Sequence, residues 1–401
     1  MGFPRSRFRP WCGRVVVRSV IAGFFWILFP GWAGAADYVI QISVDGLGSP
    51  YLRQALDLGM APNFARFLAE GSGTLNARTD YDYTITLPGH TTMLTGRPVL
   101  DKFGDDTSGH LWTENFETAP PLTLQANRGF YLSSTFDVAH DHGLSTALYS
   151  GKPKFSIFDR SYDGDNGAPD LIGEDNGRDK IDVTTITNFD SAAMMDSFLS
   201  HMRTSPAEYS FVHFHDTDTA GHEYGWGSEQ YATALETVDQ YLGQIFSLID
   251  SSPTLAGRTA IVLTSDHGGT AFGHSDQTLP VDYTIPFLVW GSGVAAGQDL
   301  YDLNPATRLD PGTDRPDYSL TGLQPIRNGD SGNLALSLLG LNAIPGSSID
   351  NRQDLLVAVP ELPRWSYAVA GLLAIGLCSQ SRRHGRTFWG HSQIGTTNIN
   401  E

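Results

Sequence analysis

Short apolar runs alternate with amphipathic stretches through the middle of the chain. Runs that are rich in β-branched and aromatic residues predict buried strands at residues 38–44, 146–151, 209–215, 259–265 and 285–291. Residues 228–250 carry apolar positions every three or four residues and predict a long helix. Residues 62–71 predict another helix, with Pro62 near its start and Gly71 after its end. The alternation indicates an α/β fold, expected to be a three-layer α/β/α sandwich with a mostly parallel central sheet.

The stretch from about residue 100 to 206 is the richest in irregular polar segments. We expect it to form a cap insertion within a single domain that covers residues 37–354. Ligands bind at the carboxyl ends of the strands in sheets of this kind, so the cap is expected to cover that edge.

The first 36 residues have the pattern of a secretory signal peptide. Five arginines and no acidic residue precede and flank an apolar core from about Val20 to Phe29, which Ala33-Gly34-Ala35 follows. We expect cleavage near Ala35 or Ala36. The alternative is an uncleaved anchor, but the apolar run is shorter than the roughly 20 residues that a bilayer span needs.

The other end of the chain carries a second apolar segment. Val-Pro-Glu precedes an apolar run from Trp365 to Cys378, and a basic pair follows it. Residues 359–386 thus resemble the PEP-CTERM sorting signal that exosortase cleaves, with Leu362 where a proline is usual and a tail at residues 387–401. A C-terminal membrane anchor is the alternative. Either way, we expect an exported protein in the periplasm, on the cell surface or outside the cell.

Charge and cysteine content support an exported, acidic body. The chain has 26 basic and 44 acidic residues, which argues against a nucleic-acid partner. Removal of the two terminal segments takes nine basic and two acidic residues, and leaves 17 and 42, a net charge of −25. Both cysteines, Cys12 and Cys378, lie in those segments, so a mature chain would have neither a disulfide nor a cysteine nucleophile.

Carboxylates and histidines follow three of the predicted strands. Asp45 follows the first, DTDTAGH follows the strand at 209–215, and DHGGTAFGH follows the strand at 259–265. A single Asp-Gly pair is an ordinary turn, but three such strand ends at one edge point to a site. Six ligands could hold two divalent ions, most suitably Zn²⁺, with Mn²⁺ or Mg²⁺ possible: Asp218, His222 and His274 for one, and Asp45, Asp266 and His267 for the other.

TITLPGHTTMLTGR, residues 84–97, offers a nucleophile. Pro88 fits the first position of a helix and Gly96 its end, so Thr86 is predicted just ahead of a helix N-terminus. Free backbone N–H groups and the helix dipole there favour an alkoxide and an incoming phosphate. A threonine before a proline is a weak signal when taken alone.

Four motifs taken together, in this order, resemble the alkaline phosphatase superfamily, in particular its nucleotide pyrophosphatase/phosphodiesterase branch. They are DG after the first strand, T-x-P-x-H-x-x-x-x-T-G, D-x-x-G-H and S-D-H-G. The resemblance implies that Thr86 is the nucleophile, becomes covalently phosphorylated and also ligates the metal of Asp45, Asp266 and His267. It implies that the other metal activates the hydrolytic water.

The chain departs from that pattern at several positions. Gly89 replaces an asparagine that is usual in eukaryotic relatives, so the contact of that amide with phosphate must be replaced or absent. His274 follows the S-D-H motif closely, as in other bacterial relatives. No sulfatase signature is present, which argues against a formylglycine sulfatase.

Further polar residues near these motifs are assigned structural roles. His213 is expected to be a core histidine, His90 to support the helix start, and Asp216 to lie beside the site. Lys152 and Lys154 could meet a phosphate, but we expect them to be solvated.

The function predicted is that of an exported two-metal phosphohydrolase that cleaves phosphodiester, pyrophosphate or phosphomonoester bonds in small substrates. Signal peptidase and exosortase are its expected processing partners. The alternatives are a non-catalytic metal-binding surface protein and a related phosphonate hydrolase.

Overall fold

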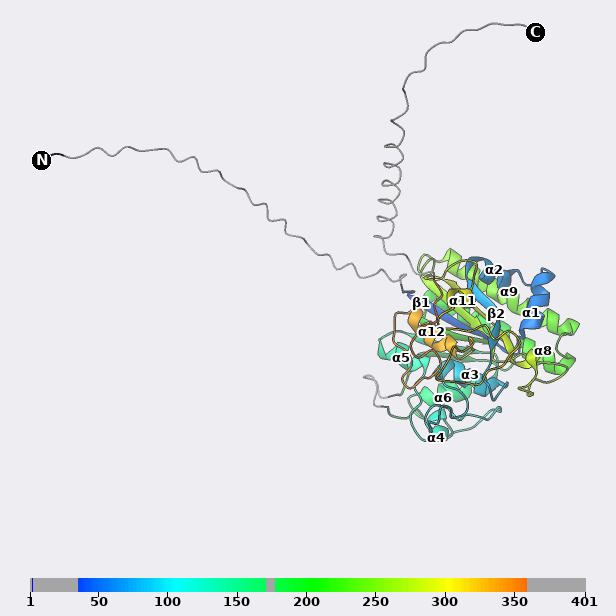
Figure 1. The fold of residues 1–401 in the computed structure, drawn as a ribbon, viewed down its shortest axis with the longest axis horizontal. Helices are drawn as coiled ribbons and strands as arrows, with labels where there is room; N and C mark the ends of the chain where they lie inside the picture. Colours follow the sequence, from blue (N-terminus) through cyan, green and yellow to red (C-terminus); the bar gives the residue numbers. More distant parts are fainter. Residues whose placement is uncertain (1, 3–34, 171–176, 359–401) are drawn as a thin grey trace, which may run out of the picture. The chain divides into compact units, whose positions relative to one another are not determined.

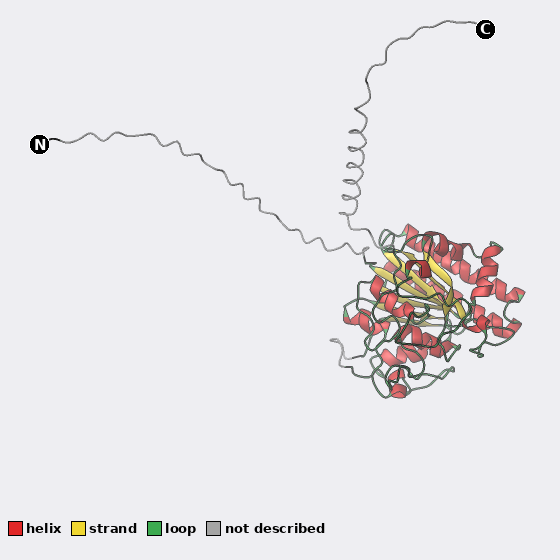
Figure 2. Ribbon diagram, in the orientation of Figure 1, coloured by secondary structure: helices red, strands yellow, loops and turns green. Residues whose placement is uncertain are grey.

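The computed structural model describes residues 35–170 and 177–358, together with the isolated Gly2. It is a mixed α/β structure around one eight-stranded sheet, with helices on both faces (Figure 2). The predicted fold class is therefore confirmed. The predicted signal peptide, the sorting segment and the tail lie outside the described residues, apart from Gly2 and residues 35–36. Among the described residues, no helix combines the length and the apolar character that a membrane span requires.

The sheet runs in the order β4-β3-β5-β1-β6-β7-β2-β8. The strands are β1 Tyr38–Val44, β2 Ser72–Arg78, β3 Thr146–Ser150, β4 Val183–Ile186, β5 Tyr209–Phe214, β6 Thr259–Thr264, β7 Thr284–Gly291 and β8 Gln298–Asp299. Only β7 runs against its neighbours β6 and β2, and every other pair is parallel. The carboxyl ends of β3, β5, β1 and β6 consequently lie along one edge.

The helices that cover the sheet differ in length. They are α1 Ser49–Asp57, α2 Pro62–Glu70, α3 Thr86–Thr95, α4 Leu124–Arg128, α5 Thr135–Asp141, α6 Ser156–Tyr162, α7 Ser191–Thr204, α8 Asp216–Tyr224, α9 Glu229–Ser251, α10 Pro280–Tyr283, α11 Leu300–Leu303 and α12 Asp330–Leu338, with a short 3₁₀ turn η1 at Pro153–Phe155. Ser228 caps α9 by accepting a hydrogen bond from the Tyr231 N–H.

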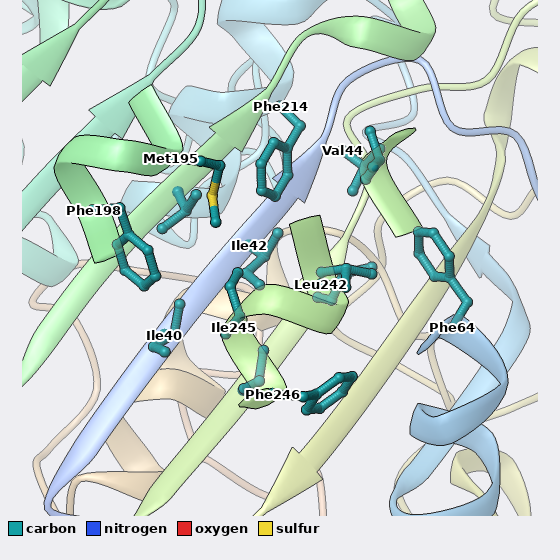
Figure 3. Close-up of a cluster of buried hydrophobic side chains, with 14 of the residues drawn as sticks. Ile40, Ile42, Val44, Phe64, Met195, Phe198, Phe214, Leu242, Ile245 and Phe246 are labelled. Atoms are coloured by element: carbon teal, nitrogen blue, oxygen red, sulfur yellow. The ribbon is translucent and has the colours of Figure 1, made fainter. Parts of the chain in front are cut away.

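Two apolar layers hold the helices to the sheet. On one face, α1, α2 and α9 lie together, and Leu242 and Phe246 of α9 pack with Phe64 of α2 and Ile42 of β1 (Figures 1 and 3). On the other face, α3, α5, α6 and α12 contribute a second cluster that includes Leu87. Both faces of β1 are buried, which explains its nearly continuous apolar sequence.

The segment from 100 to 206, which was expected to form a cap insertion, contributes strands to the central sheet. It contains β3 and β4, which pair in the central sheet, and α7, which packs beside β3 and α9. The connections between these elements also bring side chains to the pocket described below.

Candidate active site

Three neighbouring strands bring acidic residues to the same edge of the sheet. Asp45 follows β1, Asp218 lies in the first turn of α8 directly after β5, and Asp266 follows β6. Because β5 and β6 both pair with β1 in parallel, their carboxyl ends converge. The convergence expected from the sequence is therefore present in the structure.

Gly46 allows these segments to approach one another. Its φ is +75°, and a Cβ built there would lie 2.9 Å from the Cα of Asp218. The Gly46 N–H donates to Oδ1 of Asp266 at 3.1 Å. A residue with a side chain would therefore clash with the backbone that carries Asp218.

Two groups of side chains have the arrangement of metal ligands, and they share one residue. One group is Asp45, Asp266 and His267, and the other is Asp218, His267 and His274. Nε2 of His267 lies 3.2 Å from Oδ2 of Asp266, 3.4 Å from Oδ1 of Asp45 and 3.9 Å from Oδ1 of Asp218. His267 thus faces both groups.

His222 lies at the solvent edge of the second group. Its Nε2 is 3.4 Å from Oδ1 of Asp218 and 3.1 Å from Nε2 of His274, and its side chain is 48% exposed. The structure therefore brings it beside Asp218 and His274, as expected, while His267 is the more buried partner of that pair.

The three histidines are oriented by main-chain oxygens. Nδ1 contacts the carbonyl of Gly268 in His267, of Thr84 in His274 and of Phe272 in His222, at 2.6–3.1 Å. A proton on Nδ1 leaves the lone pair of Nε2 directed at the acidic residues, which is the usual arrangement of ligating histidines. Burial lowers the pKa of His267 to about 3 and also lowers that of His274, so both rings are neutral, as a metal ligand must be.

Unpartnered polar atoms gather in the same place. Four buried side-chain atoms of the site have no hydrogen-bond partner: Oδ1 of Asp45, Oδ1 of Asp218, Oδ2 of Asp266 and Nε2 of His267. Buried acceptors without a donor are costly, and divalent cations held by the two groups would satisfy all four. The donor set of carboxylate oxygens and imidazole nitrogens suits Zn²⁺. The residues therefore fit bound divalent metal.

Lys152 is buried, which corrects our expectation that it is solvated. It follows β3, is 3% exposed, and its Nζ lies 2.6 Å from Oδ2 of Asp45 and 2.5 Å from Oδ2 of Asp218. Lysine after a strand is common at surfaces, and no sequence pattern indicates that parallel pairing of β3 with β5 would bury this one. The lysine connects the two acidic groups.

The charge of Lys152 affects the pKa values of the site's carboxyl groups unequally. Burial by itself would raise the pKa of Asp45, but the charge of Lys152 and the His213 hydrogen bond lower it well below its usual value. Burial, followed by the charges of Asp45 and Asp218, raises the pKa of Asp266 well above its usual value. An excess of buried negative charge therefore remains around Asp266, as expected of a cation site.

Two other histidines are held at both ring nitrogens. His213 contacts Asp45 Oδ2 and Ser150 Oγ, each at 2.9 Å. His90 contacts Ser43 Oγ at 2.8 Å and the Thr86 carbonyl at 2.7 Å. With no free nitrogen they support their neighbours, as the sequence suggested.

Thr86 is the first residue of α3, so the helix begins two residues before Pro88, where the sequence predicted its first position. The helix ends at Gly96, whose φ of +60° is left-handed. Thr86 lines a pocket of about 460 Å³ together with Asp218, His222 and His274. The candidate nucleophile and the second metal-binding group therefore share one cavity.

Asn115 is a pocket residue that the sequence analysis missed. Its Oδ1 accepts from the Leu87 N–H at 2.9 Å and from Nζ of Lys154 at 3.0 Å. It therefore connects the start of α3 to a lysine whose pKa burial, and then Lys152, lowers to about 8. A lone asparagine in an irregular segment carries no sequence signal.

The structure explains the glycine at position 89. A Cβ built there would lie 3.1 Å from Cβ of Asp266. A larger side chain would press against the metal-binding loop, while Asn115 brings an amide to the pocket from another segment.

Comparisons with known proteins agree with this geometry. Residues 39–319 match the family model described as type I phosphodiesterase/nucleotide pyrophosphatase. Among curated proteins, GPI ethanolamine phosphate transferase 1 of mouse is 30% identical over 285 residues, which cover 68% of this chain and 27% of that protein. The human protein of the same name is 27% identical over 150 residues, which cover 34% of this chain and 15% of the relative. The matched part of the chain thus spans about a quarter of the length of the mouse protein and a smaller share of the human one.

Solved structures share the fold. Murine ectonucleotide pyrophosphatase/phosphodiesterase 5, solved as an inactive variant in complex with AMP, superposes with a TM-score of 0.54 at 14% identity, and the match covers 80% of this chain and all of that one. The human counterpart gives a TM-score of 0.53 with the same coverage and identity.

Proposed function

The chain belongs to the type I phosphodiesterase/nucleotide pyrophosphatase family, and we propose that it hydrolyses phosphodiester, pyrophosphate or phosphomonoester bonds through a phosphothreonine intermediate at Thr86. Family membership supports hydrolysis of a phosphate ester, and metal dependence is typical of the family. The observation that supports the covalent route is the position of Thr86, at the start of α3 and in one pocket with Asp218 and His274.

We assign two divalent ions to the site, most suitably Zn²⁺, with Mn²⁺ or Mg²⁺ as alternatives. Asp45, Asp266 and His267 would hold one, with Thr86 as a further ligand, and Asp218, His222 and His274 would hold the other. Metals bound there would supply positive charge to the attacking and leaving oxygens of the reaction at phosphorus.

The chain's own residues bind and orient the ester. The start of α3 favours a phosphate group, and Lys154 adds a positive charge to the same pocket. The Thr86 oxygen would bond to phosphorus as the bond to the leaving oxygen breaks, and the hydroxyl proton would pass through solvent to the leaving oxygen. Water would then attack the same phosphorus, which releases the phosphate product and restores the hydroxyl.

The relatives differ in the reaction that their names describe. The curated relatives are named as phosphate transferases and the structural neighbours as pyrophosphatase/phosphodiesterases. A phosphothreonine could pass its group either to an alcohol or to water, so the acceptor alone separates the two reactions. We favour water, because the family that matches most of the chain is that of the phosphodiesterases.

Thr86 variants test the proposal on bis-p-nitrophenyl phosphate and p-nitrophenyl phosphate. Thr86→Ala should lower kcat by about 10³–10⁶, as for loss of other covalent nucleophiles. Thr86→Ser should retain much more activity, since the hydroxyl remains. Thr95→Ala, at the far end of the same helix, is the control for loss of a buried threonine.

Two outcomes would contradict the proposal. A Thr86→Ala enzyme that keeps its metals and works within a few-fold of the wild type would exclude the covalent route. Absence of any turnover by the metal-loaded wild type would exclude the function.

We also propose export, on the basis of the two terminal segments. The mature protein from its native host should lack about the first 35 residues and those after about residue 360. Intact-mass measurement checks this, and recovery of residues 384–401 in mature protein would exclude cleavage at the second segment.

A further inference from the structure

A second cavity lies at the opposite end of α3 from Thr86. The N–H groups of Ser348 and Ile349 each donate to the carbonyl of Gly96, which ends the helix, at 2.9 Å, and both residues line the cavity. Its volume is about 490 Å³, within the range of about 300–1,000 Å³ that is usual for small-molecule sites. Among the residues that the structure describes, none lines both this cavity and the pocket at Thr86.

Arg308 holds one wall of the second cavity together. Its Nη2 lies 3.0 Å from Oδ1 of Asp330 and 2.7 Å from Oδ1 of Asp350, and its Nη1 lies 2.6 Å from Oδ1 of Asp354. All four side chains line the cavity. Because a buried guanidinium fixes one oxygen of each carboxylate, this polar wall is already formed before any ligand binds.

Four buried polar atoms of the lining residues have no hydrogen-bond partner in the described part of the chain. They are Oδ2 of Asp350, Oε1 of Gln324, Oγ of Ser348 and Nε of Arg327. The side chains of Asp350 and Arg327 are each only 1% exposed. Since such atoms are costly to leave unpaired and include both oxygens and an N–H group, they favour a ligand that both donates and accepts hydrogen bonds.

The charges around the second cavity disfavour an ionic ligand. Three arginines and three aspartates line it, so their formal charges cancel: Arg308, Arg327, Arg352, Asp330, Asp350 and Asp354. Burial, and then the charge of Asp330, raises the pKa of Asp350 to about 8, which makes this carboxyl group a weak partner for a cation at neutral pH. Arg308 is already paired with carboxylates, which disfavours an anion. In the described ranges, the two groups with the arrangement of metal ligands include none of these aspartates.

Another part of the lining is apolar. Leu320 is 76% exposed and Leu323 is 39% exposed, and the rings of Phe103 and Tyr318 meet edge to face with their centroids 6.4 Å apart. A sugar ring matches such a mixed lining, because its hydroxyl groups both donate and accept at the ring edge while its C–H groups form an apolar face.

We propose that the second cavity binds a neutral saccharide of one or two rings. Its hydroxyl groups would form hydrogen bonds with Asp350, Gln324 and Arg327. The apolar face of the ring would lie against Leu320 and Tyr318. The site is independent of the proposed hydrolysis, because it uses none of the residues assigned to that reaction.

Binding to the full chain, with a chelator present, tests the site. The probes are D-glucose, D-galactose, N-acetyl-D-glucosamine and maltose, measured by saturation-transfer NMR and calorimetric titration. At least one of them should bind with a Kd of about 10 mM or lower. Spermidine, inorganic phosphate and bis-p-nitrophenyl phosphate should not displace it. Thr86→Ala should bind it as the wild type does.

Variants assign the binding to the named side chains. Gln324→Leu and Ser348→Ala each remove one hydrogen-bonding group and should raise Kd about three- to tenfold. Leu320→Ser should also weaken binding, because it removes apolar surface from the wall. Gln298→Leu and Leu58→Ser change exposed residues outside the cavity and should leave Kd unchanged. The melting temperature of each variant shows whether it is folded.

Several results would overturn the saccharide site. They are the absence of binding by all four sugars, binding that folded Gln324→Leu and Leu320→Ser variants leave unchanged, and displacement by spermidine or phosphate. Displacement by bis-p-nitrophenyl phosphate, or loss of binding in Thr86→Ala, would place the sugar in the Thr86 pocket instead. Turnover of phosphate esters tests the function proposed above, and neither measurement decides the other.

Discussion

The ammonium of Lys152 lies 2.6 Å from Oδ2 of Asp45, and both side chains are buried. The same nitrogen lies 2.5 Å from Oδ2 of Asp218, so one lysine joins the two groups of metal-binding residues. This arrangement gives the site a positive charge from the protein itself and holds Oδ2 of each carboxylate in an ion pair. The other oxygen of each, Oδ1 of Asp45 and Oδ1 of Asp218, has no hydrogen-bond partner.

Lys152→Met should destabilise the metal-free protein by about 3–5 kcal/mol, because loss of one member of a buried ionic group leaves the others uncompensated. Lys102→Met is a matched control, since Lys102 also bridges two carboxylates, Asp82 and Asp317, but at the surface. Its cost should be about 1 kcal/mol or less. Urea unfolding with a chelator present measures both. Added Zn²⁺ should raise the melting temperature of the Lys152 variant more than that of the wild type, and equal costs for the two variants would contradict this role of Lys152.

His267 faces both groups of ligands, and we expect it to be the histidine on which metal content depends most. His267→Ala should lower the metal content from about two ions per chain towards one or none, since Nε2 is among the atoms that lack a partner. His222→Ala should have a smaller effect on binding, because that side chain is half-exposed at the edge of the site. Elemental analysis after equilibration at limiting Zn²⁺ compares them, and a larger loss in the His222 variant would reverse this order.

The sequence predicted the strands whose pattern is simple. The runs at β1, β3, β5, β6 and β7 were predicted within one residue at each end, because strands that are largely buried on both faces are mostly apolar and rich in β-branched and aromatic residues. β2, with the sequence SGTLNAR, was not predicted, because glycine and asparagine interrupt it and it pairs near the edge of the sheet. β4 has only four residues, each partly or fully exposed, and so lacks a pattern to detect.

The site could be predicted where ligands follow strands and not where it depends on tertiary contacts. Asp45 directly follows β1, and Asp266 and His267 come within three residues of the end of β6, so topology alone brings them together. Lys152 and Asn115 come from loops, and their contacts with Asp45 and Leu87 join residues far apart in sequence. The left-handed backbone conformation of Phe189, with a φ of +56°, is likewise a feature that no sequence pattern indicates.

Asn115 should matter for turnover through its contact with the start of α3. Asn115→Asp keeps an oxygen to accept from Leu87 N–H and Lys154, but places a negative charge beside the incoming phosphate. We expect kcat/KM on bis-p-nitrophenyl phosphate to fall by about 10² or more, with little change in melting temperature. Asn115→Ala removes the acceptor without adding charge, so it should cost less activity and more stability. The reverse order of activities would show that charge at this position does not oppose the substrate.

Asp137 lies in α5 and is not among the residues that line the pocket, and it provides a test of pH-dependent stability. Its Oδ2 accepts from the N–H of Ser134 at 2.8 Å and from its hydroxyl at 2.6 Å, and the Tyr131 hydroxyl donates to Oδ1. Burial raises the pKa of Asp137 to about 7, against about 3.9 for an aspartate in an unfolded chain. The folded protein therefore binds a proton here that the unfolded chain has already lost.

The sign of the effect follows from that difference. The contribution of Asp137 to stability is complete below about pH 4 and is lost as the pH rises through about 7. Between these values the folded protein binds one more proton than the unfolded chain, so a rising pH favours the unfolded chain. Asp137→Asn stays neutral throughout. The free energy of unfolding of the wild type, minus that of this variant, should therefore decrease between pH 4 and 7, with a slope of at most about 1.4 kcal/mol per pH unit.

Urea unfolding of both proteins across pH 4–7.5, with chelator present, measures this difference and removes the contribution of metal binding. Asp105→Asn supplies the opposite control, because hydrogen bonds from the Thr107 side chain and backbone lower the pKa of Asp105. Its contribution to stability should be lost as the pH falls through the acidic range and should not change between pH 5 and 7. If the wild type and the Asp137 variant instead kept a constant difference from pH 4 to 7, Asp137 would be ionised in the folded protein. Its capping contacts at Ser134 would then outweigh the cost of burying its charge.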